Sequence, residues 1–307
     1  MVIIVGKECS KDIKYLEEYS NKEYPAKMSK DIKIVFHKKD DKDRHIFLNS
    51  KDKKVNIKKL LDKHNTIFRY GCRAFKLEGF NKVIYNKSKS IKLAGDKYAS
   101  RMLFKSINIP IPTTYSCCEI HRIVESGNEI NFPLIRRPLK HSKSNDFIII
   151  DSEKDLIDYK EEDITTKGFY YSEFIDKVQE LRVHVAHGKV ISVIEKRPPT
   201  KKQYSWGMVD NFDNVRWNDW QMNIIKSSVE CVKILGLTFG AVDVIVDNYN
   251  NYYILEVNTA PDFSYSNYLT SKMIKYFNWV SDTKDRKVWQ EVEEDKASNF
   301  AWKKTDF

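Results

Sequence analysis

Two carboxylates and one amide occur on two neighbouring apolar runs late in the chain, in a pattern that could bind a metal ion. Asp243 lies within AVDVIVD at 241–247, and Glu256 and Asn258 lie within YYILEVN at 252–258. Both runs have the composition of strands, and the Asp and Asn residues between them suit a turn, so a hairpin is predicted. Alternate residues of a strand share a face, so Glu256 and Asn258 point the same way, with Asp243 within about one residue of register opposite Glu256.

This grouping favours a magnesium site over a group of solvated surface acids. Like charges that lie close together repel one another unless a cation separates them, and hard oxygen ligands favour Mg²⁺. Surface acids at strand ends are common, but Asp243 is embedded in apolar residues, where an unpaired carboxylate is costly to bury. Magnesium held by few carboxylates shares its remaining positions with water and nucleotide phosphates, so cations that bind a nucleotide are expected nearby.

Cationic residues recur in the segments that precede this hairpin. They are Lys97, Arg136, Arg137, Arg182, Lys196 and Arg197. Arg136 and Arg137 are adjacent in a predicted strand, so either one of them points toward the metal ligands or both snorkel to solvent. A lone strand arginine is usually a surface or salt-bridge residue, whereas several cations around one acidic hairpin are better explained by a triphosphate. The chain has neither a GxxxxGK[ST] loop nor a GxGxxG fingerprint, so the nucleotide would be held in another way.

The first ninety residues contain the elements of a separate small domain. Apolar runs alternate with polar stretches of helical character, the runs at 2–5, 32–36, 45–48 and 66–70 and the helices at 9–19 and 56–64. Strands that alternate with helices predict an open α/β sheet. Residues 83–91 are expected to form a further strand or turn that leads out of this domain.

The rest of the chain is expected to begin with a helix and continue as strands. Asp96 is the predicted N-cap of a helix whose apolar stripe is Ala99, Leu103 and Ile107. A second helix over 219–235 is predicted to be capped by Asp219 and ended by Gly236. Strands are predicted at 133–137, 146–150 and 169–175, with a helix within 152–160 and a hairpin over 181–195 that turns at Gly188.

Composition limits the classes of protein that fit. The 307 residues include 53 Lys and Arg against 43 Asp and Glu, a formal net charge of +10. The basic residues are scattered and form no arginine-rich stripe with interleaved aromatics, so nucleic acid stays an alternative partner only. The five cysteines lack CxxC spacing, which fits a reducing cytoplasm. The opening apolar run is too short for a signal peptide, and no stretch approaches membrane-spanning length.

The order of these segments resembles the ATP-grasp superfamily, nearest to the ribosomal-protein glutamate ligases and related phage-type peptide ligases. The matching segments are AGDKYASRMLFKSINIPIPTT at 94–114, FPLIRRPLKHS at 132–142, EFIDKVQELRVHVAHGKVISVIEKR at 173–197, and LGLTFGAVDVIVD through ILEVNTAPDF at 235–263. The Asp…Glu-x-Asn-x-x-Pro pattern is the most specific of them. The resemblance implies an α+β or α/β chain with two subdomains that sandwich ATP, at 93–172 and 173–281. A small α/β domain at 1–92 would precede them, and a tail at 282–307 would follow.

The resemblance also implies a role for each matching residue. The nucleotide would be held by Lys97, Arg137 and Ser142 at the phosphates, by Glu173, Phe174 and Ile175 at the adenine, and by Glu180 at the ribose. The metal ligands would be Asp243, Glu256 and Asn258, while Arg182 and one of Lys196 or Arg197 would face the γ-phosphate and the acyl phosphate. Arg137 stands where the family usually has lysine, and the loop after Pro138 lacks the family's glycines, so its phosphate contacts would rest on side chains such as Ser142.

The implied activity is ATP-dependent ligation of a carboxylate to an amine through an acyl phosphate. ATP and two Mg²⁺ ions would be the cofactors, with Mn²⁺ as a substitute for Mg²⁺. The amine would be an amino acid or a peptide, and a macromolecular or nucleic-acid acceptor and a homodimer stay open. Two other interpretations also stay open, namely an ATP-grasp phosphotransferase that does not ligate and a nucleotide-binding module without catalysis.

Overall fold

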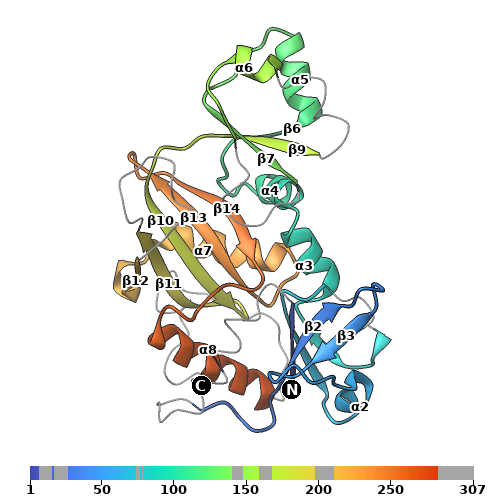
Figure 1. Cartoon of the computed structure of the whole chain (residues 1–307). Helices are drawn as coiled ribbons and strands as arrows, with labels where there is room; N and C mark the ends of the chain where they lie inside the picture. Colours follow the sequence, from blue (N-terminus) through green and yellow to red (C-terminus); the bar gives the residue numbers. More distant parts are fainter. Residues whose placement is uncertain are drawn as a thin grey trace.

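The computed structural model describes residues 1–6, 16, 27–73, 77, 79–139, 148–158, 168–197 and 211–282. Within these residues the chain forms three β-sheets with helices between and around them (Figure 1). Both helices and strands are present in each part, as the predicted mixed α/β class requires. No helix in the described part of the chain is long and apolar enough to cross a membrane.

The N-terminal sheet has the strand order β3-β2-β1-β4-β5. Its strands are β1 (Val2–Gly6), β2 (Lys33–Lys39), β3 (His45–Leu48), β4 (Thr66–Tyr70) and β5 (Val83–Tyr85). Only β2 and β3 pair antiparallel among these strands. Residues 2–5 are fully buried because β1 is the central strand, covered on both faces. The four predicted apolar strands are confirmed, as is a helix within 56–64, α2 (Ile57–Asp62). Of the predicted helix at 9–19, only Leu16 is described.

The connection out of this sheet differs from its prediction. Residues 83–91 contain β5 and the start of α3 (Ser88–Ala94), so the second half is helical. Between the two elements, Asn86 adopts a positive φ of 55°. Its side-chain oxygen accepts from the backbone N–H groups of Thr238 at 2.9 Å and Phe239 at 3.1 Å, and its amide donates to the Phe239 carbonyl at 2.9 Å. Asn86 therefore fastens the N-terminal sheet to the strand that carries Asp243.

Helix α4 (Lys97–Ser106) begins as predicted, because the Asp96 side chain accepts from the Ala99 N–H at 2.9 Å. Its buried face was predicted wrongly. The buried residues are Ser100, Arg101 and Phe104, whereas Ile107 at the end of the expected apolar stripe is 38% exposed. Hydrophobic periodicity could not reveal this face, because its central residue is an arginine.

The second sheet is antiparallel, has the order β6-β9-β7-β8, and forms the upper lobe in Figure 1. Its strands are β6 (Thr114–Ser116), β7 (Leu134–Pro138), β8 (Ile148–Ile150) and β9 (Phe169–Glu173). Two helices pack on one face around Ile120 and Leu156, α5 (Cys117–Glu125) and α6 (Glu153–Asp158). Helix α5 was not predicted, although Ser116 and Glu119 form a capping box at its start.

The third sheet is antiparallel and has the order β12-β11-β10-β13-β14. Its strands are β10 (Lys177–Ala186), β11 (Lys189–Arg197), β12 (Asn211–Val215), β13 (Phe239–Asp247) and β14 (Tyr252–Asn258). The predicted hairpin at Gly188 and the predicted hairpin that carries the acids are both confirmed. Asp247 closes the second turn by accepting from the N–H groups of Tyr249 at 3.0 Å and Asn251 at 2.8 Å.

Helix α7 (Met222–Ile234) packs on one face of this sheet. Its start was predicted wrongly, because Asp219 lies in the short helix η3 (Trp217–Asp219) and the N-cap is Gln221. Its end is as predicted, since Gly236 follows with a φ of 68° that suits a glycine after a helix.

The two faces of the third sheet have opposite character. Leu181 and Val183 point toward α7, whereas the alternating residues Glu180, Arg182 and His184 point to the other face. One end of that second face is covered by α8 (Asn267–Asp282) and by aromatic residues of β4. The other end of that face carries Glu180 and Arg182. Figure 1 shows the upper end of this sheet below the second sheet, with α4 beside β14.

The N-terminal sheet also holds the loop that follows β14. The Tyr70 hydroxyl, at the end of β4, donates to the backbone carbonyl of Pro261. The Tyr70 ring stacks on Phe239 with their centroids 5.9 Å apart. The loop after Asn258 is therefore fixed from two sides, by its own hairpin and by the N-terminal sheet.

Candidate active site

The predicted metal ligands converge on one face of the β13–β14 hairpin. Asp243 and Glu256 are direct cross-strand partners, and Asn258 pairs with Ala241 one position further along the same face. A register shift between Asp243 and Val244 marks a bulge, a feature that redirects side chains in a sheet. The Asn258 side chain accepts from the Ala260 N–H at 2.9 Å. The convergence predicted from alternation and register is thus present.

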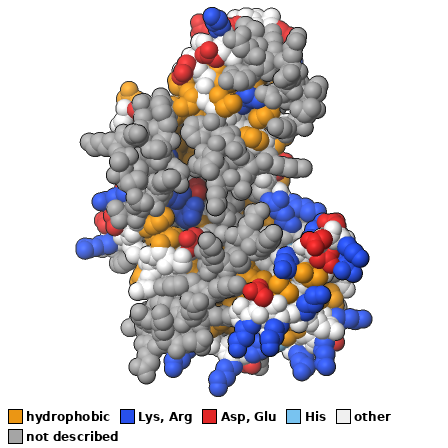
Figure 2. Space-filling model, in the orientation of Figure 1, with side chains coloured by type: hydrophobic (Ala, Val, Ile, Leu, Met, Phe, Trp, Pro, Cys, Tyr) orange, Lys and Arg blue, Asp and Glu red, His pale blue; other side chains and the backbone are white. Residues whose placement is uncertain are grey.

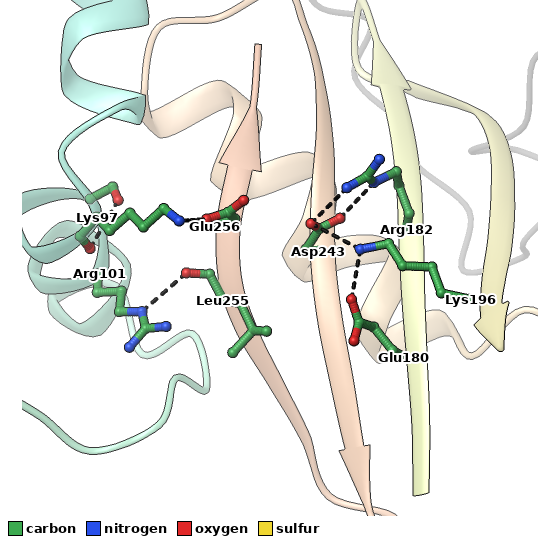
Figure 3. Close-up of polar contacts among 9 residues, drawn as sticks. Lys97, Arg101, Glu180, Arg182, Lys196, Asp243, Leu255 and Glu256 are labelled. Atoms are coloured by element: carbon green, nitrogen blue, oxygen red, sulfur yellow. Dashed lines mark hydrogen bonds and ion pairs between the residues drawn. The ribbon is translucent and has the colours of Figure 1, made fainter. Parts of the chain in front are cut away.

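Asp243 is buried and held by two cations (Figure 3). Arg182, its partner on β10, donates from Nε to Oδ1 at 2.7 Å and from Nη2 to Oδ2 at 2.9 Å. The Nζ of Lys196 on β11 lies 3.1 Å from Oδ2. Burial alone would raise the pKa of the Asp243 carboxyl, but Arg182 and Lys196 outweigh burial and hold that pKa below its usual range. The carboxylate is therefore charged and fixed in orientation.

The ion pairs continue along the strands to Glu180. Its Oε1 accepts from Lys196 at 2.7 Å, and its Oε2 accepts from Lys177 at 2.6 Å. Burial raises the pKa of Glu180, yet Lys196 and Lys177 together bring it below its usual value. Both carboxylate oxygens of the residue predicted to bind ribose are therefore engaged by lysines in this structure.

Helix α4 supplies the cations on the other side of the hairpin (Figure 3). Lys97 forms an ion pair with Glu256. Arg101, one helical turn later, donates from Nε to the carbonyl of Leu255 at 3.0 Å. Sequence reasoning missed Arg101, although its spacing of four residues from Lys97 places both cations on one helix face.

The adjacent arginines of β7 have separate environments. Arg136 is buried and stacks over Phe169, with its guanidinium 3.9 Å from the ring centroid. Arg137 is half-buried on the opposite side, and its positive charge contributes to lowering the pKa of both Arg101 and Lys177, after the larger effect of burial. Arg137 is therefore the member of the pair that lies near the charged cluster.

The predicted adenine-binding segment lies where the second and third sheets join. The backbone N–H of Glu173, the last residue of β9, donates to Thr113 O at 2.8 Å, and that of Phe174 donates to Pro133 O at 3.0 Å. The Glu173 carboxylate accepts from the Thr113 hydroxyl at 3.0 Å. Ile175 follows, half-buried, in the connection to β10.

Two other predicted residues do not join this cluster. The Arg197 side chain is 58% exposed and pairs with Glu195 at 3.5 Å and Asp213 at 3.1 Å, because strand alternation turns it away from Lys196. Of the alternatives Lys196 and Arg197, only Lys196 therefore contacts Asp243. Ser142 lies outside the described residues.

The charges of the cluster suit a polyanion with a metal ion. Cations are more frequent than carboxylates among the residues linked by these interactions: Lys97, Arg101, Arg137, Lys177, Arg182 and Lys196 against Glu180, Asp243 and Glu256. Across the described ranges, no group of three or more His, Cys, Asp or Glu residues could hold a metal ion by itself. A site with two carboxylates and an amide fits Mg²⁺ that takes its other ligands from phosphates and water.

Comparison with known proteins identifies the fold. No family model matches the sequence. The D-alanine–D-alanine ligase of Dechloromonas aromatica (strain RCB) is 25% identical over 177 residues, which are 55% of this chain and 58% of that protein. The same enzyme of Wolbachia sp. subsp. Drosophila simulans (strain wRi) is 24% identical over 184 residues, 56% of each chain. The match thus spans a little over half the length of these relatives.

Solved structures match over nearly the whole chain. The macrocyclase MdnC of Microcystis aeruginosa MRC, bound with its precursor peptide MdnA, has a TM-score of 0.59 at 14% identity, over 90% of this chain and 99% of that one. A RiPP-associated ATP-grasp ligase of Chryseobacterium gregarium, in complex with ADP and a leader and core peptide, has a TM-score of 0.59 at 16% identity. The match covers 95% of this chain and 99% of that one. The VanG D-Ala:D-Ser ligase of Enterococcus faecalis has a TM-score of 0.60 at 15% identity, over 90% of this chain and 97% of that one. The resemblance seen in the sequence is confirmed at the level of the fold: this chain has the ATP-grasp fold.

Proposed function

We propose that this protein is an ATP- and Mg²⁺-dependent ligase that joins a carboxylate to an amine through an acyl phosphate. The observation that carries the proposal is the pair Asp243 and Glu256, which face each other across one hairpin with a cation from a different element on each. The names of the relatives support the reaction class, since they include a D-alanine–D-alanine ligase, an ATP-grasp ligase in complex with peptides and a macrocyclase bound with its precursor peptide. Such an arrangement would offset the negative charge of a triphosphate and would hold Mg²⁺ beside it.

The residues divide into groups that would bind each part of the nucleotide. Asp243, Glu256 and Asn258 would hold Mg²⁺, two ions by the family resemblance, and Mn²⁺ could replace it. When bound, the metal supplies charge neutralisation and orientation at the phosphates. The remaining contacts would be Lys97, Arg137 and Ser142 at the phosphates, Glu173, Phe174 and Ile175 at the adenine, and Glu180 at the ribose.

Arg182 and Lys196 would act at the reacting end of the nucleotide. A substrate carboxylate oxygen attacks the γ-phosphorus, the bond from that phosphorus to ADP breaks, and the carboxylate becomes an acyl phosphate. The amine nitrogen then attacks the acyl carbon, phosphate leaves, and the nitrogen loses a proton. Arg182 would donate to the oxyanion of this second step, a contact typically worth about a hundredfold to a thousandfold in rate. The geometry supports Lys196, not Arg197, as its partner.

The proposed substrates are an amino acid or peptide as the amine and a carboxylate of the same chemical class. Lys and Arg side chains are frequent over the N-terminal sheet, at the lower right of Figure 2, but acidic side chains lie among them. Lys39 with Asp43 and Arg44 with Asp40 are such pairs. This mixture favours a peptide over a nucleic acid as a large acceptor. A cytoplasmic location, a homodimer, and the division into 1–92, 93–172, 173–281 and 282–307 belong to the same proposal.

Trapping the acyl phosphate with hydroxylamine tests this function. The protein is incubated with MgATP, hydroxylamine and pools of amino acids or peptides as acids, and hydroxamates are detected by mass spectrometry. The proposal expects a hydroxamate from at least one pool, and none without ATP. A phosphorylated product that resists hydroxylamine would instead indicate a phosphotransferase, and ATP binding without any turnover would indicate a binding module.

A further inference from the structure

Arg101 is a buried cation whose partners are neutral. The residue is 3% exposed. Its Nε donates to Leu255 O at 3.0 Å, one Nη donates to the Thr114 hydroxyl oxygen at 3.3 Å, and the guanidinium lies 5.5 Å from the centroid of the Tyr170 ring. Among the residues that the structure describes, no carboxylate forms an ion pair with it. Burial of a charge is costly unless an anion compensates it.

Within the described residues, the surroundings of Arg101 offer it a shared carboxylate and not one of its own. Burial is the main cause that lowers the pKa of the Arg101 guanidinium; Tyr170 and Glu256 raise it, and the positive charge of Arg137 lowers it further. Glu256 is already paired with Lys97. Burial and the charge of Arg137 therefore disfavour the charged form of Arg101, and only Tyr170 and a carboxylate shared with Lys97 oppose them among the groups described.

The position of Arg101 indicates which anion would fit. Arg101 lies over the ring of Tyr170, and the cross-strand partner of Tyr170 is Arg137, whose positive charge acts on Arg101. Lys97 stands one turn earlier on the same helix, beside the hairpin that carries Glu256. A guanidinium has five N–H donors in a planar fork. The two hydrogen bonds to Leu255 and Thr114 use two of them, so further N–H groups can donate to a ligand.

We propose that Arg101 is a further phosphate-binding residue, which acts with Lys97 and Arg137 on the polyphosphate of the nucleotide. The inference rests on the proposed function in that the ligand is taken to be a nucleoside triphosphate. A negatively charged polyphosphate supplies the counter-charge that Arg101 lacks among the described residues, and its oxygens match the N–H geometry of a guanidinium. The bond to the Leu255 carbonyl then holds the guanidinium beside the β13–β14 hairpin.

The alternative is that Arg101 only braces α4 against β14 and β6. The two roles differ in what they do to ligands without phosphate. Removal of a phosphate-binding cation weakens the binding of ATP and leaves the binding of adenosine unchanged. Loss of a purely structural contact distorts the site and weakens the binding of both ligands. Arg136 provides a matched control, since it is also 3% exposed but stacks on Phe169, away from the cluster.

The experiment compares the full chain with the variants Arg101→Gln and Arg136→Gln. Dissociation constants for ATP and for adenosine are measured with Mg²⁺ by competition against a fluorescent ATP analogue, and the melting temperature of each free protein is recorded. For Arg101→Gln we expect ATP to bind about tenfold to a hundredfold more weakly, the range for a hydrogen bond to a charged group, with adenosine unchanged. For Arg136→Gln we expect wild-type affinity for both ligands, whatever its melting temperature.

Two results would overturn the inference. One is an Arg101→Gln protein that binds ATP as tightly as the wild type, and the other is an equal loss of ATP and adenosine. If Arg101→Gln does not fold, Arg101→Lys keeps the charge without the fork, and roughly a tenfold loss for ATP alone is expected. A wild-type protein that binds adenosine as tightly as it binds ATP would overturn the proposed function itself, and the inference with it.

Discussion

Arg182 binds Asp243 through two parallel hydrogen bonds, from Nε to Oδ1 at 2.7 Å and from Nη2 to Oδ2 at 2.9 Å. This fork fixes the plane of a carboxylate that is buried on β13 and faces Glu256 across the hairpin. Lys196 contacts the same carboxylate at 3.1 Å. The acid proposed to hold the metal is thus oriented by two cations that are themselves proposed to act on the substrate.

The neighbours Lys196 and Arg197 should differ sharply in their effect on activity. Lys196→Met removes the cation that joins Glu180 to Asp243, so we expect ADP formation to fall by roughly a hundredfold or more. Arg197→Gln removes an exposed cation on the other face and should leave turnover near that of the wild type, with stability within about 0.5 kcal/mol. Steady-state kinetics and thermal melting check both. Equal losses in the two variants would contradict the arrangement described.

Glu180 should determine whether the protein distinguishes ATP from 2′-deoxyATP. If its carboxylate contacts the ribose hydroxyls, the wild type should prefer ATP by about tenfold in kcat/KM, the worth of one hydrogen bond. Glu180→Gln should lose most of that preference. A wild-type protein that uses both nucleotides equally would show that Glu180 serves only to bind Lys177 and Lys196.

Acid should destabilise the fold through two buried histidines. Burial lowers the pKa of His184 to about 3 and that of His187 to about 4, from the usual 6.5. Below pH 6.5 the unfolded chain therefore binds protons that the folded chain does not. The unfolding free energy consequently decreases as the pH is lowered. Each histidine contributes up to about 1.4 kcal/mol per pH unit, until its folded pKa is reached.

Urea unfolding between pH 7 and pH 4.5 measures this effect. His184→Gln should reduce the slope of unfolding free energy against pH by one histidine's share, even if the variant is less stable at pH 7. The Ser192 hydroxyl, 3.1 Å from the His184 ring, can still bond to a glutamine. An unchanged slope would mean that His184 is protonated in the folded protein.

Asn86 should stabilise the junction between the N-terminal sheet and β13. Asn86→Ala leaves the backbone groups of Thr238 and Phe239 without their side-chain partner, so we expect a loss of at least about 2 kcal/mol in unfolding free energy. Asn250→Ala is a matched control, because Asn250 also has a positive φ, of 64°, but lies exposed in the β13–β14 turn. It should cost about 1 kcal/mol, the cost of the backbone conformation alone. Equal losses, measured by urea unfolding, would assign no stabilising role to the Asn86 hydrogen bonds.

The sequence alone predicted those features of the fold and the site that depend on residues close together in the chain. The pairing of Asp243 with Glu256 follows from two strands joined by a short turn, and the start of α4 follows from the capping of Asp96. The structure was needed for features that depend on how the elements pack together. The buried face of α4 is centred on Arg101, which no hydrophobic pattern would select, and a 3₁₀ turn at Asp219 displaces the start of α7.

Lys177 shows why part of the site escaped prediction. Strand alternation places residues three apart on opposite faces, so Lys177 and Glu180 would not be expected to meet. A register shift between Lys177 and Gln179 interrupts the alternation, and the two side chains form an ion pair at 2.6 Å. Such an irregularity depends on the partner strand, which the sequence of β10 alone does not specify.

The most direct test of the central claim is ADP release that depends on both an acid and an amine. Wild-type protein, Glu256→Gln and the exposed control Glu230→Gln are given MgATP and pools of amino acids and peptides. We expect at least one pool to stimulate ADP release by the wild type and by Glu230→Gln, no release by Glu256→Gln, and a joined product in the mass spectrum of that pool. ATP binding with no stimulation by any pool, or a Glu256→Gln variant as active as the wild type, would contradict the proposal that this hairpin catalyses ligation.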